Sequence, residues 1–178
     1  MRKSLIDLLE AYPIKESENP LAQIYCDLDG VLTDFDGRFQ HYAGMSPKAY
    51  EAKYGTGPFW NLIDREIGIE FWSGMGWMQG GEELWNYIKY YNPIILSSPS
   101  KDPLSRKGKT LWVEKNLHPS PKIIFKFSEN KRRHAKDHIL IDDKRSNIED
   151  WKEDGGIALR CLRGNIEPVL TELQKLGY

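Results

Sequence analysis

Short apolar runs recur along the chain, and polar stretches separate them. The first run spans residues 22–26, and four later runs cover residues 93–96, 122–125, 138–141 and 156–159. The later runs are rich in Ile or Leu and do not alternate between apolar and polar positions, which is typical of strands that are covered on both faces. The pattern therefore predicts five short strands and favours a parallel sheet.

Helical patterns lie between most of these runs. The predicted helices cover residues 82–91, 109–116, 147–152 and 167–176. Another short amphipathic helix is expected before Pro13, formed around Leu5, Ile6, Leu8 and Leu9. Strands that alternate with helices predict an α/β fold, with an open parallel sheet of Rossmann-like type flanked by helices.

Residues 36–80 do not follow this alternation. They are rich in glycine and also contain large aromatic side chains, which include Phe59, Trp60, Phe71, Trp72 and Trp77. We interpret this segment as a small, mainly helical cap inserted after the first strand. The predicted division is a core domain formed by residues 1–35 and 81–178, and a cap formed by residues 36–80.

Composition and charge narrow the class of protein. Hydrophobic residues make up 40% of the 178 residues, charged residues make up 29%, and the net charge is −1. These values fit a globular, soluble chain and argue against nucleic acid or a membrane surface as the main partner. No apolar run approaches the roughly 18 residues that span a bilayer. The two cysteines, Cys26 and Cys161, are expected to be reduced core residues, which suits a cytoplasmic protein.

Polar side chains suited to chemistry follow three of the predicted strands. Asp27 and Asp29 follow the first, Ser97 and Ser98 the second, and Asp142 with Asp143 the fourth. In an open α/β sheet, ligands bind beyond the carboxyl ends of the strands. Clustered carboxylates repel one another unless a cation lies between them, and a set of hard oxygen ligands suits Mg²⁺.

Serine hydroxyls and a lysine would complete a phosphate site at this edge. Ser97 and Ser98 are able to donate hydrogen bonds to phosphate oxygens, and Lys131 or Lys109 would add a positive charge. Aspartates after strands also commonly form turns or cap helices. Three strand ends that carry such residues in order make the chemical interpretation the stronger one.

These segments resemble the motifs of the haloacid dehalogenase superfamily. The segment Asp27-Leu28-Asp29-Gly30-Val31-Leu32-Thr33-Asp34 resembles the first motif, Leu96-Ser97-Ser98 the second and Ile141-Asp142-Asp143 the fourth. The resemblance covers about residues 22–160 and implies a phosphatase, because the phosphatase branch has an aspartate two places after the nucleophile.

The resemblance also implies a role for each residue. Asp27 would be the nucleophile that forms an aspartyl-phosphate, and Asp29 would be the general acid and base. The side chains of Asp27 and Asp142 and the backbone carbonyl of Asp29 would hold Mg²⁺, and Asp143 would be a further ligand or orient a metal-bound water. Ser97 would bind the phosphoryl group.

The third motif of the superfamily is a lone lysine, and the sequence offers several candidates. Lys131 lies before the fourth strand, where the superfamily usually has this residue. Lys109, expected to open the helix after the second strand, is the alternative, and Lys101 is a third. Ser146 and Asn147 are expected to cap the helix that follows Asp143.

Within the superfamily the chain most resembles the 5′(3′)-deoxyribonucleotidases. The matching segments include Ser97-Ser98-Pro99, residues 109–115, Ser128-Glu129-Asn130-Lys131 and residues 140–143. That family has a helical cap whose aromatic side chains stack on the base. The corresponding candidates are Phe35, Trp60, Phe71, Trp72 and Trp77, although such rings also form the core of a small helical unit.

Other functions remain open at this stage. The lead hypothesis is hydrolysis of deoxynucleoside monophosphates. The expected binding partner is then a small-molecule phosphomonoester, and the expected oligomeric state is a monomer or a homodimer. A 3′-phosphatase acting on nucleic-acid ends would use the basic run from Lys131 to Lys136, and a phosphatase whose cap selects a non-nucleotide substrate such as a sugar phosphate is a further alternative. A receiver-like phosphoacceptor module is disfavoured, because the third predicted strand is not followed by an aspartate.

Overall fold

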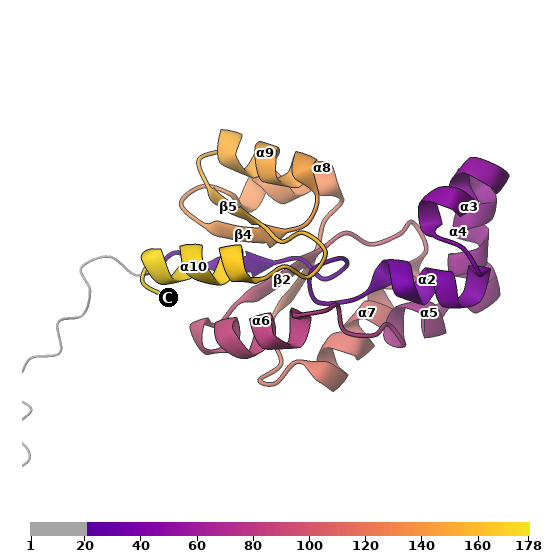
Figure 1. Ribbon diagram of the computed structural model, residues 1–178, viewed down its shortest axis with the longest axis horizontal. Helices are drawn as coiled ribbons and strands as arrows, with labels where there is room; N and C mark the ends of the chain where they lie inside the picture. Colours follow the sequence, from indigo (N-terminus) through magenta and orange to yellow (C-terminus); the bar gives the residue numbers. More distant parts are fainter. Residues whose placement is uncertain (1–20) are drawn as a thin grey trace, which may run out of the picture.

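The computed structural model describes residues 21–178, so the helix expected around Leu5–Leu9 lies outside the described residues. A five-stranded parallel sheet forms the centre of the described chain, with the order β3-β2-β1-β4-β5 (Figure 1). The strands are β1 (Ile24–Cys26), β2 (Ile94–Ser97), β3 (Ile123–Phe125), β4 (Ile139–Asp142) and β5 (Ile157–Arg160). The predicted parallel α/β sheet is therefore confirmed, with strand ends within a residue or two of those expected.

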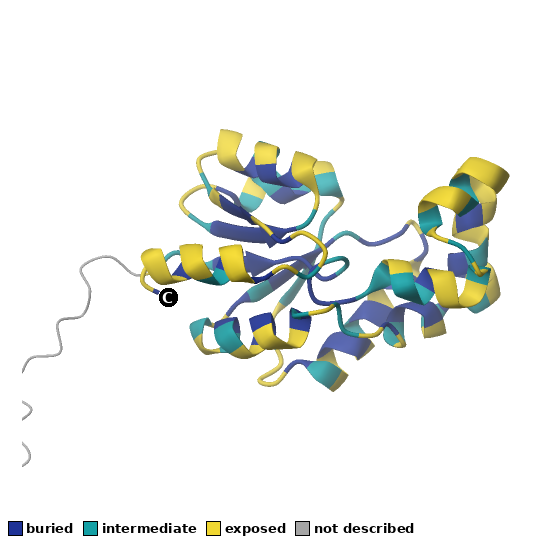
Figure 2. Ribbon diagram, in the orientation of Figure 1, coloured by how far each residue is buried: buried dark blue, intermediate teal, exposed yellow. Residues whose placement is uncertain are grey.

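Helices cover both faces of the sheet. On one face lie α6 (Gly81–Ile88), α7 (Pro103–Asn116) and α10 (Glu167–Lys175), which bury Leu84, Trp112 and Leu173 in the larger core cluster. On the other face lies α9 (Arg145–Glu153), whose Trp151 packs with Tyr25 and Leu140. Between the two layers, β1 and β4 are buried and dark blue in Figure 2, because both of their faces are covered, whereas the edge strands β3 and β5 are only partly buried.

Three short helical segments complete this core. A 3₁₀ turn, η2 (Lys89–Tyr91), extends α6, while α8 (Ser128–Lys131) and the 3₁₀ turn η3 (Arg132–His134) connect β3 to β4. The helix predicted over residues 109–116 begins six residues earlier, at Pro103. Asp102 is its N-cap and accepts a hydrogen bond from the backbone N–H of Leu104. Lys109 therefore lies in the middle of α7 and does not open it.

Five helical segments connect β1 to the rest of the core and lie beyond the carboxyl ends of the strands (Figure 1). They are α2 (Phe35–Ala43), α3 (Pro47–Tyr54), α4 (Thr56–Asn61), the π-helix η1 (Leu62–Ile67) and α5 (Ile69–Ser73). We call them the helical unit. It corresponds to the expected cap, and its description as a separate domain stays a prediction.

The helical unit is fixed to the core through α5 and η1. A Cβ on Gly108 of α7 would lie 2.5 Å from Cβ of Trp72, so the glycine allows α5 to approach α7 closely. Ser100 donates a hydrogen bond of 2.9 Å to the buried Asp64 of η1, and Arg65 pairs with Asp102 at 3.3 Å.

From residue 21 onward, none of the helices has the length and apolar character needed to cross a membrane.

Candidate active site

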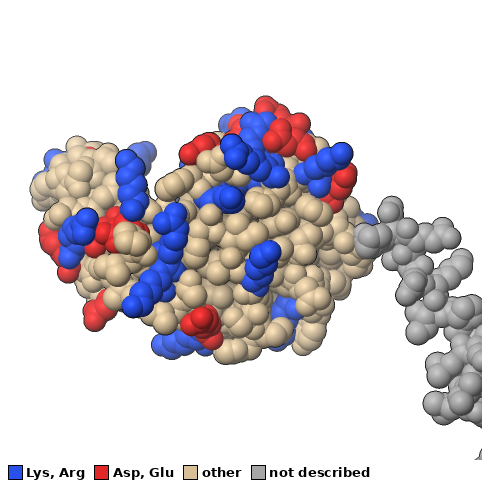
Figure 3. All heavy atoms as spheres, turned by 180° about the vertical axis from the view of Figure 1, so that it is seen from behind, with Lys and Arg blue, Asp and Glu red and all other residues tan. Residues whose placement is uncertain are grey.

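A cavity of about 690 Å³ lies between the carboxyl ends of the strands and the helical unit. Asp27, Asp29 and Asp143 line it on the side of the sheet, and Phe35, Trp60 and Trp72 line it on the side of the helical unit. Seen from behind, a notch separates the helical unit from the core, and Lys and Arg side chains lie beside it (Figure 3). The polar strand ends and the aromatic segment thus meet at one place, and the volume suits a small organic ligand.

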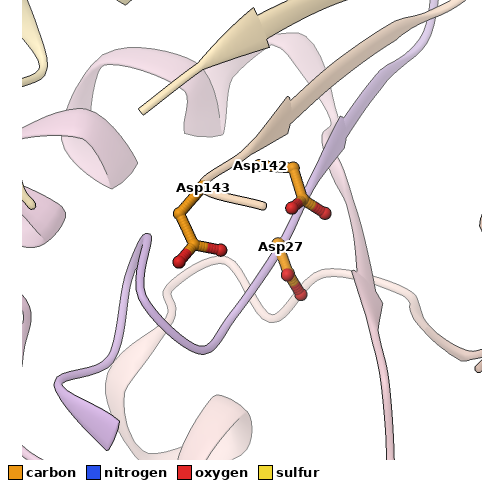
Figure 4. Close-up of side chains that lie close together, drawn as sticks. All are labelled: Asp27, Asp142 and Asp143. Atoms are coloured by element: carbon orange, nitrogen blue, oxygen red, sulfur yellow. The ribbon is translucent and has the colours of Figure 1, made fainter. Parts of the chain in front are cut away.

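Three carboxylates converge at the sheet side of this cavity: Asp27 and Asp143 line it, and Asp142 is fully buried next to them. Asp27 follows β1, Asp142 ends β4 and Asp143 follows it, and Figure 4 shows their side chains close together. One oxygen atom from each lies within 4.8 Å of the others. A Cβ on Gly30, where φ is +80°, would lie 2.5 Å from Oδ2 of Asp143, so both the turn and the space require glycine.

Lys131 lies between two of these carboxylates. Its Nζ is 2.8 Å from Oδ2 of Asp27 and 2.8 Å from Oδ2 of Asp142, and its side chain is only 1% exposed. Burial acts to lower the pKa of this lysine, but Asp27 and Asp142 outweigh that effect and raise it. Lys131 is therefore a fixed positive charge within the carboxylate cluster.

Asp27 and Asp143 retain protons more strongly than usual. Burial, followed by the charge of Asp142, raises the pKa of Asp27 to about 8 even though Lys131 acts in the opposite direction. Burial and Asp142 likewise raise the pKa of Asp143 to about 6. One lysine thus does not offset the repulsion among the clustered carboxylates, and a divalent cation held by Asp27, Asp142 and Asp143 would offset it. The residues present fit Mg²⁺.

Asn147 is a site residue that the sequence interpretation missed. Its Nδ2 donates to Oδ1 and Oδ2 of Asp142 at 3.0 and 2.9 Å, and the backbone N–H of Lys144 donates to Oδ1 at 2.9 Å. The expected capping role was wrong, because Lys144 is the N-cap residue of α9 and makes no side-chain cap bond. The side chain of Asn147 instead orients Asp142.

Lys109 contacts a second set of polar groups, different from those that contact Lys131. Its Nζ donates to Oδ2 of Asp29 at 2.6 Å, to Oγ of Ser97 at 2.9 Å and to the carbonyl of Ser98 at 2.6 Å. It also lies 4.9 Å from the centre of the Trp72 ring, a cation–π contact with the helical unit. The two lysines therefore have separate partners: Lys131 pairs with Asp27 and Asp142, and Lys109 with Asp29.

The hydroxyl groups are distributed differently from expectation. Ser97 is fully buried and accepts the hydrogen bond from Lys109, whereas Ser98 lines the cavity and lies 3.4 Å from the hydroxyl of Ser128. This placement favours Ser98 over Ser97 as the hydroxyl that reaches a bound phosphate. The metal-binding role of the Asp29 carbonyl stays a prediction.

Only some of the predicted aromatic side chains line the cavity. Phe35, Trp60 and Trp72 do, and Trp60 is the most open of them at 38% exposure. Phe71 is buried against Phe35, with ring centres 5.2 Å apart, and Trp77 packs edge-on against Trp112 at 4.9 Å. Phe71 and Trp77 therefore contribute to packing and not to the cavity wall.

The basic residues that follow β3, Lys131 to Lys136, also contact different parts of the protein. Lys131 is buried in the site, whereas Arg132 pairs with Asp150, Glu153 and Asp154 of the α9 region. The cations that do line the cavity are Lys144, Arg145, Arg160 and Arg163, which the sequence interpretation did not single out. Their position at the end of β5 or just after β4 and β5, at the carboxyl edge of the sheet, is the signal that points to them.

Comparison with known proteins agrees with this geometry. No protein-family model matches the chain. A protein of Vibrio phage KVP40, provisionally named a 5′(3′)-deoxyribonucleotidase, is 29% identical over 135 residues, which covers 75% of this chain and 71% of the phage protein.

Solved structures with a similar fold include several hydrolases. A phosphonoacetaldehyde hydrolase-like protein from Oleispira antarctica has a TM-score of 0.53 and 12% identity, with coverage of 89% of this chain and 82% of that one. A HAD family enzyme from Bacteroides thetaiotaomicron, in a magnesium complex, has a TM-score of 0.51 and 16% identity, with coverage of 86% and 99%. A hydrolase from Streptococcus pneumoniae TIGR4 has a TM-score of 0.53 and 14% identity, with coverage of 86% and 100%.

These likenesses confirm the resemblance that the motifs indicate. Asp27, Ser97 and Asp142 stand at the ends of β1, β2 and β4, the three strands on which the motifs were expected. The chain therefore has the fold of the haloacid dehalogenase superfamily hydrolases, with Asp27, Ser97 and Asp142 at the carboxyl edge of its sheet.

Proposed function

We propose that the protein is a magnesium-dependent phosphomonoester hydrolase that uses Asp27 as its nucleophile. The observation that carries the proposal is the arrangement around Asp27: a buried carboxylate, 2.8 Å from Lys131, grouped with Asp142 and Asp143 at the sheet side of a cavity. Structural ion pairs seldom bring three carboxylates and a buried lysine to the carboxyl edge of a parallel sheet, next to a ligand-sized cavity.

In the proposed reaction, an oxygen of Asp27 attacks phosphorus and the bond from phosphorus to the ester oxygen breaks. Asp29 gives its proton to the leaving oxygen, and a water molecule then attacks the aspartyl-phosphate and returns a proton to Asp29. This second step releases inorganic phosphate and restores Asp27. Mg²⁺, when bound, neutralises negative charge on the phosphoryl oxygens.

Other side chains of the chain would hold the reacting groups in place. Lys131 keeps Asp27 beside Asp142, and Lys109 fixes the carboxylate of Asp29 at 2.6 Å. Ser98, on the cavity wall, is the hydroxyl available to a phosphoryl oxygen. Because these groups are already held by hydrogen bonds, little reorganisation is needed when the substrate binds.

We propose deoxynucleoside monophosphates as the substrates. The phage relative, provisionally named a 5′(3′)-deoxyribonucleotidase, supports this class. The aromatic wall supports it too, since Trp60, Phe35 and Trp72 all line the cavity and Trp60 is 38% exposed. Stacking of a base on such rings is worth about 1–3 kcal/mol per base.

A substrate panel with Mg²⁺ tests both parts of the proposal. We expect phosphate release from deoxynucleoside 5′- and 3′-monophosphates, loss of activity on chelation of the metal, and loss of activity in Asp27→Asn. Turnover of sugar phosphates without turnover of any nucleotide would refute the substrate class. Activity of Asp27→Asn equal to that of the unmodified protein would refute the mechanism.

A further inference from the structure

The core side of the cavity carries positive charges that the proposed reaction does not use. Four cations line the cavity: Arg160 at the end of β5, and Lys144, Arg145 and Arg163 on the segments that follow β4 and β5. Arg145 pairs with Glu149 at 2.6 Å, but within residues 21–178 the other three have no carboxylate within ion-pairing distance. Three cations therefore face the cavity with uncompensated charge.

Arg160 is directed by a contact with the carboxylate cluster. It ends β5, where it pairs in register with Asp142, and its Nε donates to the backbone carbonyl of Asp143 at 2.9 Å. That bond uses one of the five N–H donors of the guanidinium group. The remaining donors are free to bind an anion in the cavity, and the carbonyl contact fixes their direction.

Arg163 is held in a backbone conformation that does not suit arginine. It occupies the first central position of a two-residue turn closed by the bond from the N–H of Asn165 to the carbonyl of Leu162, with φ of +48°, and Gly164 follows with φ of +73°. Turns with positive φ at both central positions favour Asn-Gly. Arginine is therefore strained at this position, and such strain persists where a side chain has a function.

The turn is also fixed in place against the connection that leads from the helical unit to the core. A Cβ on Gly164 would lie 2.0 Å from the carbonyl oxygen of Gln79, so the two segments are in direct contact at a glycine. Gln79 and Gly80 immediately precede α6. Arg163 is thus presented to the cavity from a packed turn and not from a free loop.

We propose that Arg160 and Arg163 form a second anion subsite, and that the preferred substrate is a nucleotide with a second phosphate group besides the one that is hydrolysed. This inference rests on the proposed nucleotidase function. The reacting phosphate is already provided for by Ser98 and the carboxylate-bound cation, which leaves the two guanidinium groups for another anion. Planar guanidinium groups bind the oxygens of phosphate or carboxylate groups in pairs, which favours such an oxyanion over a halide, and in a nucleotide that oxyanion is a phosphate.

Two sources of this chemistry are a free nucleoside 3′,5′-bisphosphate and the phosphorylated 3′ end of a short oligonucleotide. Both present a second phosphate one sugar away from the reacting phosphate. The oligonucleotide end carries a further nucleotide that the free bisphosphate lacks. A dinucleotide with a 3′-terminal phosphate therefore distinguishes the two sources. Higher affinity for the dinucleotide than for the bisphosphate would identify the nucleic-acid end as the source.

Binding to the inactive Asp27→Asn protein with Mg²⁺ tests the subsite directly. Calorimetric Kd values are compared for a deoxynucleoside 5′-monophosphate and its 3′,5′-bisphosphate, at fixed ionic strength. We expect the bisphosphate to bind about tenfold more tightly, the size of one charge-assisted hydrogen bond. Adding Arg160→Gln or Arg163→Asn should bring this ratio toward one, whereas Arg106→Gln, on the exposed surface of α7, should leave it unchanged.

The Arg163→Asn variant separates function from folding. Asparagine suits the turn better than arginine, so we expect a thermal midpoint equal to or above that of the Asp27→Asn parent, together with loss of the bisphosphate preference. Equal Kd values for the two ligands in the parent, or a preference that both arginine variants retain, would refute the subsite. Failure of the active protein to hydrolyse any nucleotide, with the difference in binding preserved, would refute only the nucleotidase proposal.

Discussion

Replacement of Lys131 by methionine tests whether the carboxylate cluster depends on this lysine. Lys131 is 1% exposed and contacts two buried carboxylates at 2.8 Å each. Methionine keeps most of the volume but leaves Asp27 and Asp142 next to each other without a cation. Removal of one partner of a buried ion pair costs about 3–5 kcal/mol, a large part of the roughly 5–15 kcal/mol by which a domain is stable.

The measurement is urea unfolding in a chelator, so that no metal replaces the lost charge. We expect Lys131→Met to lower the free energy of unfolding by about 3–5 kcal/mol, and the double variant Lys131→Met/Asp142→Asn to recover part of that loss. Recovery is expected because the double variant leaves only one of the two carboxylates that contact Lys131. Lys107→Met, which removes an exposed lysine from α7, is the matched control and should change stability by less than about 0.5 kcal/mol.

Addition of Mg²⁺ gives a second readout on the same proteins. If the cation binds between Asp27, Asp142 and Asp143, it should stabilise Lys131→Met more than the unmodified protein, because it compensates charge that the lysine no longer compensates. A loss of less than about 1 kcal/mol in the chelator would refute the reasoning, since that value is typical of an exposed ion pair.

Three further predictions concern the metal, the pH and the base. Gly30→Ala should weaken Mg²⁺ binding measured by calorimetry, because its Cβ would lie 2.5 Å from Oδ2 of Asp143 and displace this carboxylate; unchanged affinity would contradict the placement. The pKa of Asp143, raised to about 6, exceeds its unfolded value of about 3.9, so the folded state holds this proton more tightly. Urea unfolding in a chelator should therefore show stability falling as the pH rises from about 4 to 6, and Asp143→Asn should flatten that slope. Trp60→Ala should raise KM for deoxynucleotides by about 5- to 100-fold and change KM for glycerol phosphate much less; equal effects on the two would argue against base stacking.

The sheet was predictable because its signal is local. Buried parallel strands need continuous apolar runs, and residues 94–97 and 139–142 differ from the predicted runs by a single residue. The start of α7 was missed because it depends on a cap: Asp102 and Pro103 begin the helix ahead of the apolar spacing. That early start is what carries Lys109 into the interior.

The strand-end residues of the site were predictable, and their pairing was not. Strand ends identify Asp27, Asp142 and Asp143, because parallel strands bring their carboxyl ends to one edge. The contact between Lys109 and Asp29 joins positions 80 residues apart, and a side chain of that length reaches its partner only once α5 and α7 have packed. Sequence spacing distinguishes neither Lys131 from Lys109 nor Ser98 from Ser97, since each choice depends on which side chain the folded core directs toward Asp27.

The charges of the site explain why cation and substrate must bind together. Asp27, Asp29, Asp142 and Asp143, when ionised, carry four negative charges, and Lys109 and Lys131 offset only two of them. The remainder equals the charge of one divalent cation, which a cluster this buried favours strongly. Without that cation the carboxylates repel a phosphate dianion, and with it the carboxylate cluster and its two lysines are close to neutral. The uncompensated charges of Lys144, Arg160 and Arg163 then act on the incoming phosphates, so phosphate affinity should depend on the metal first and on the arginines second.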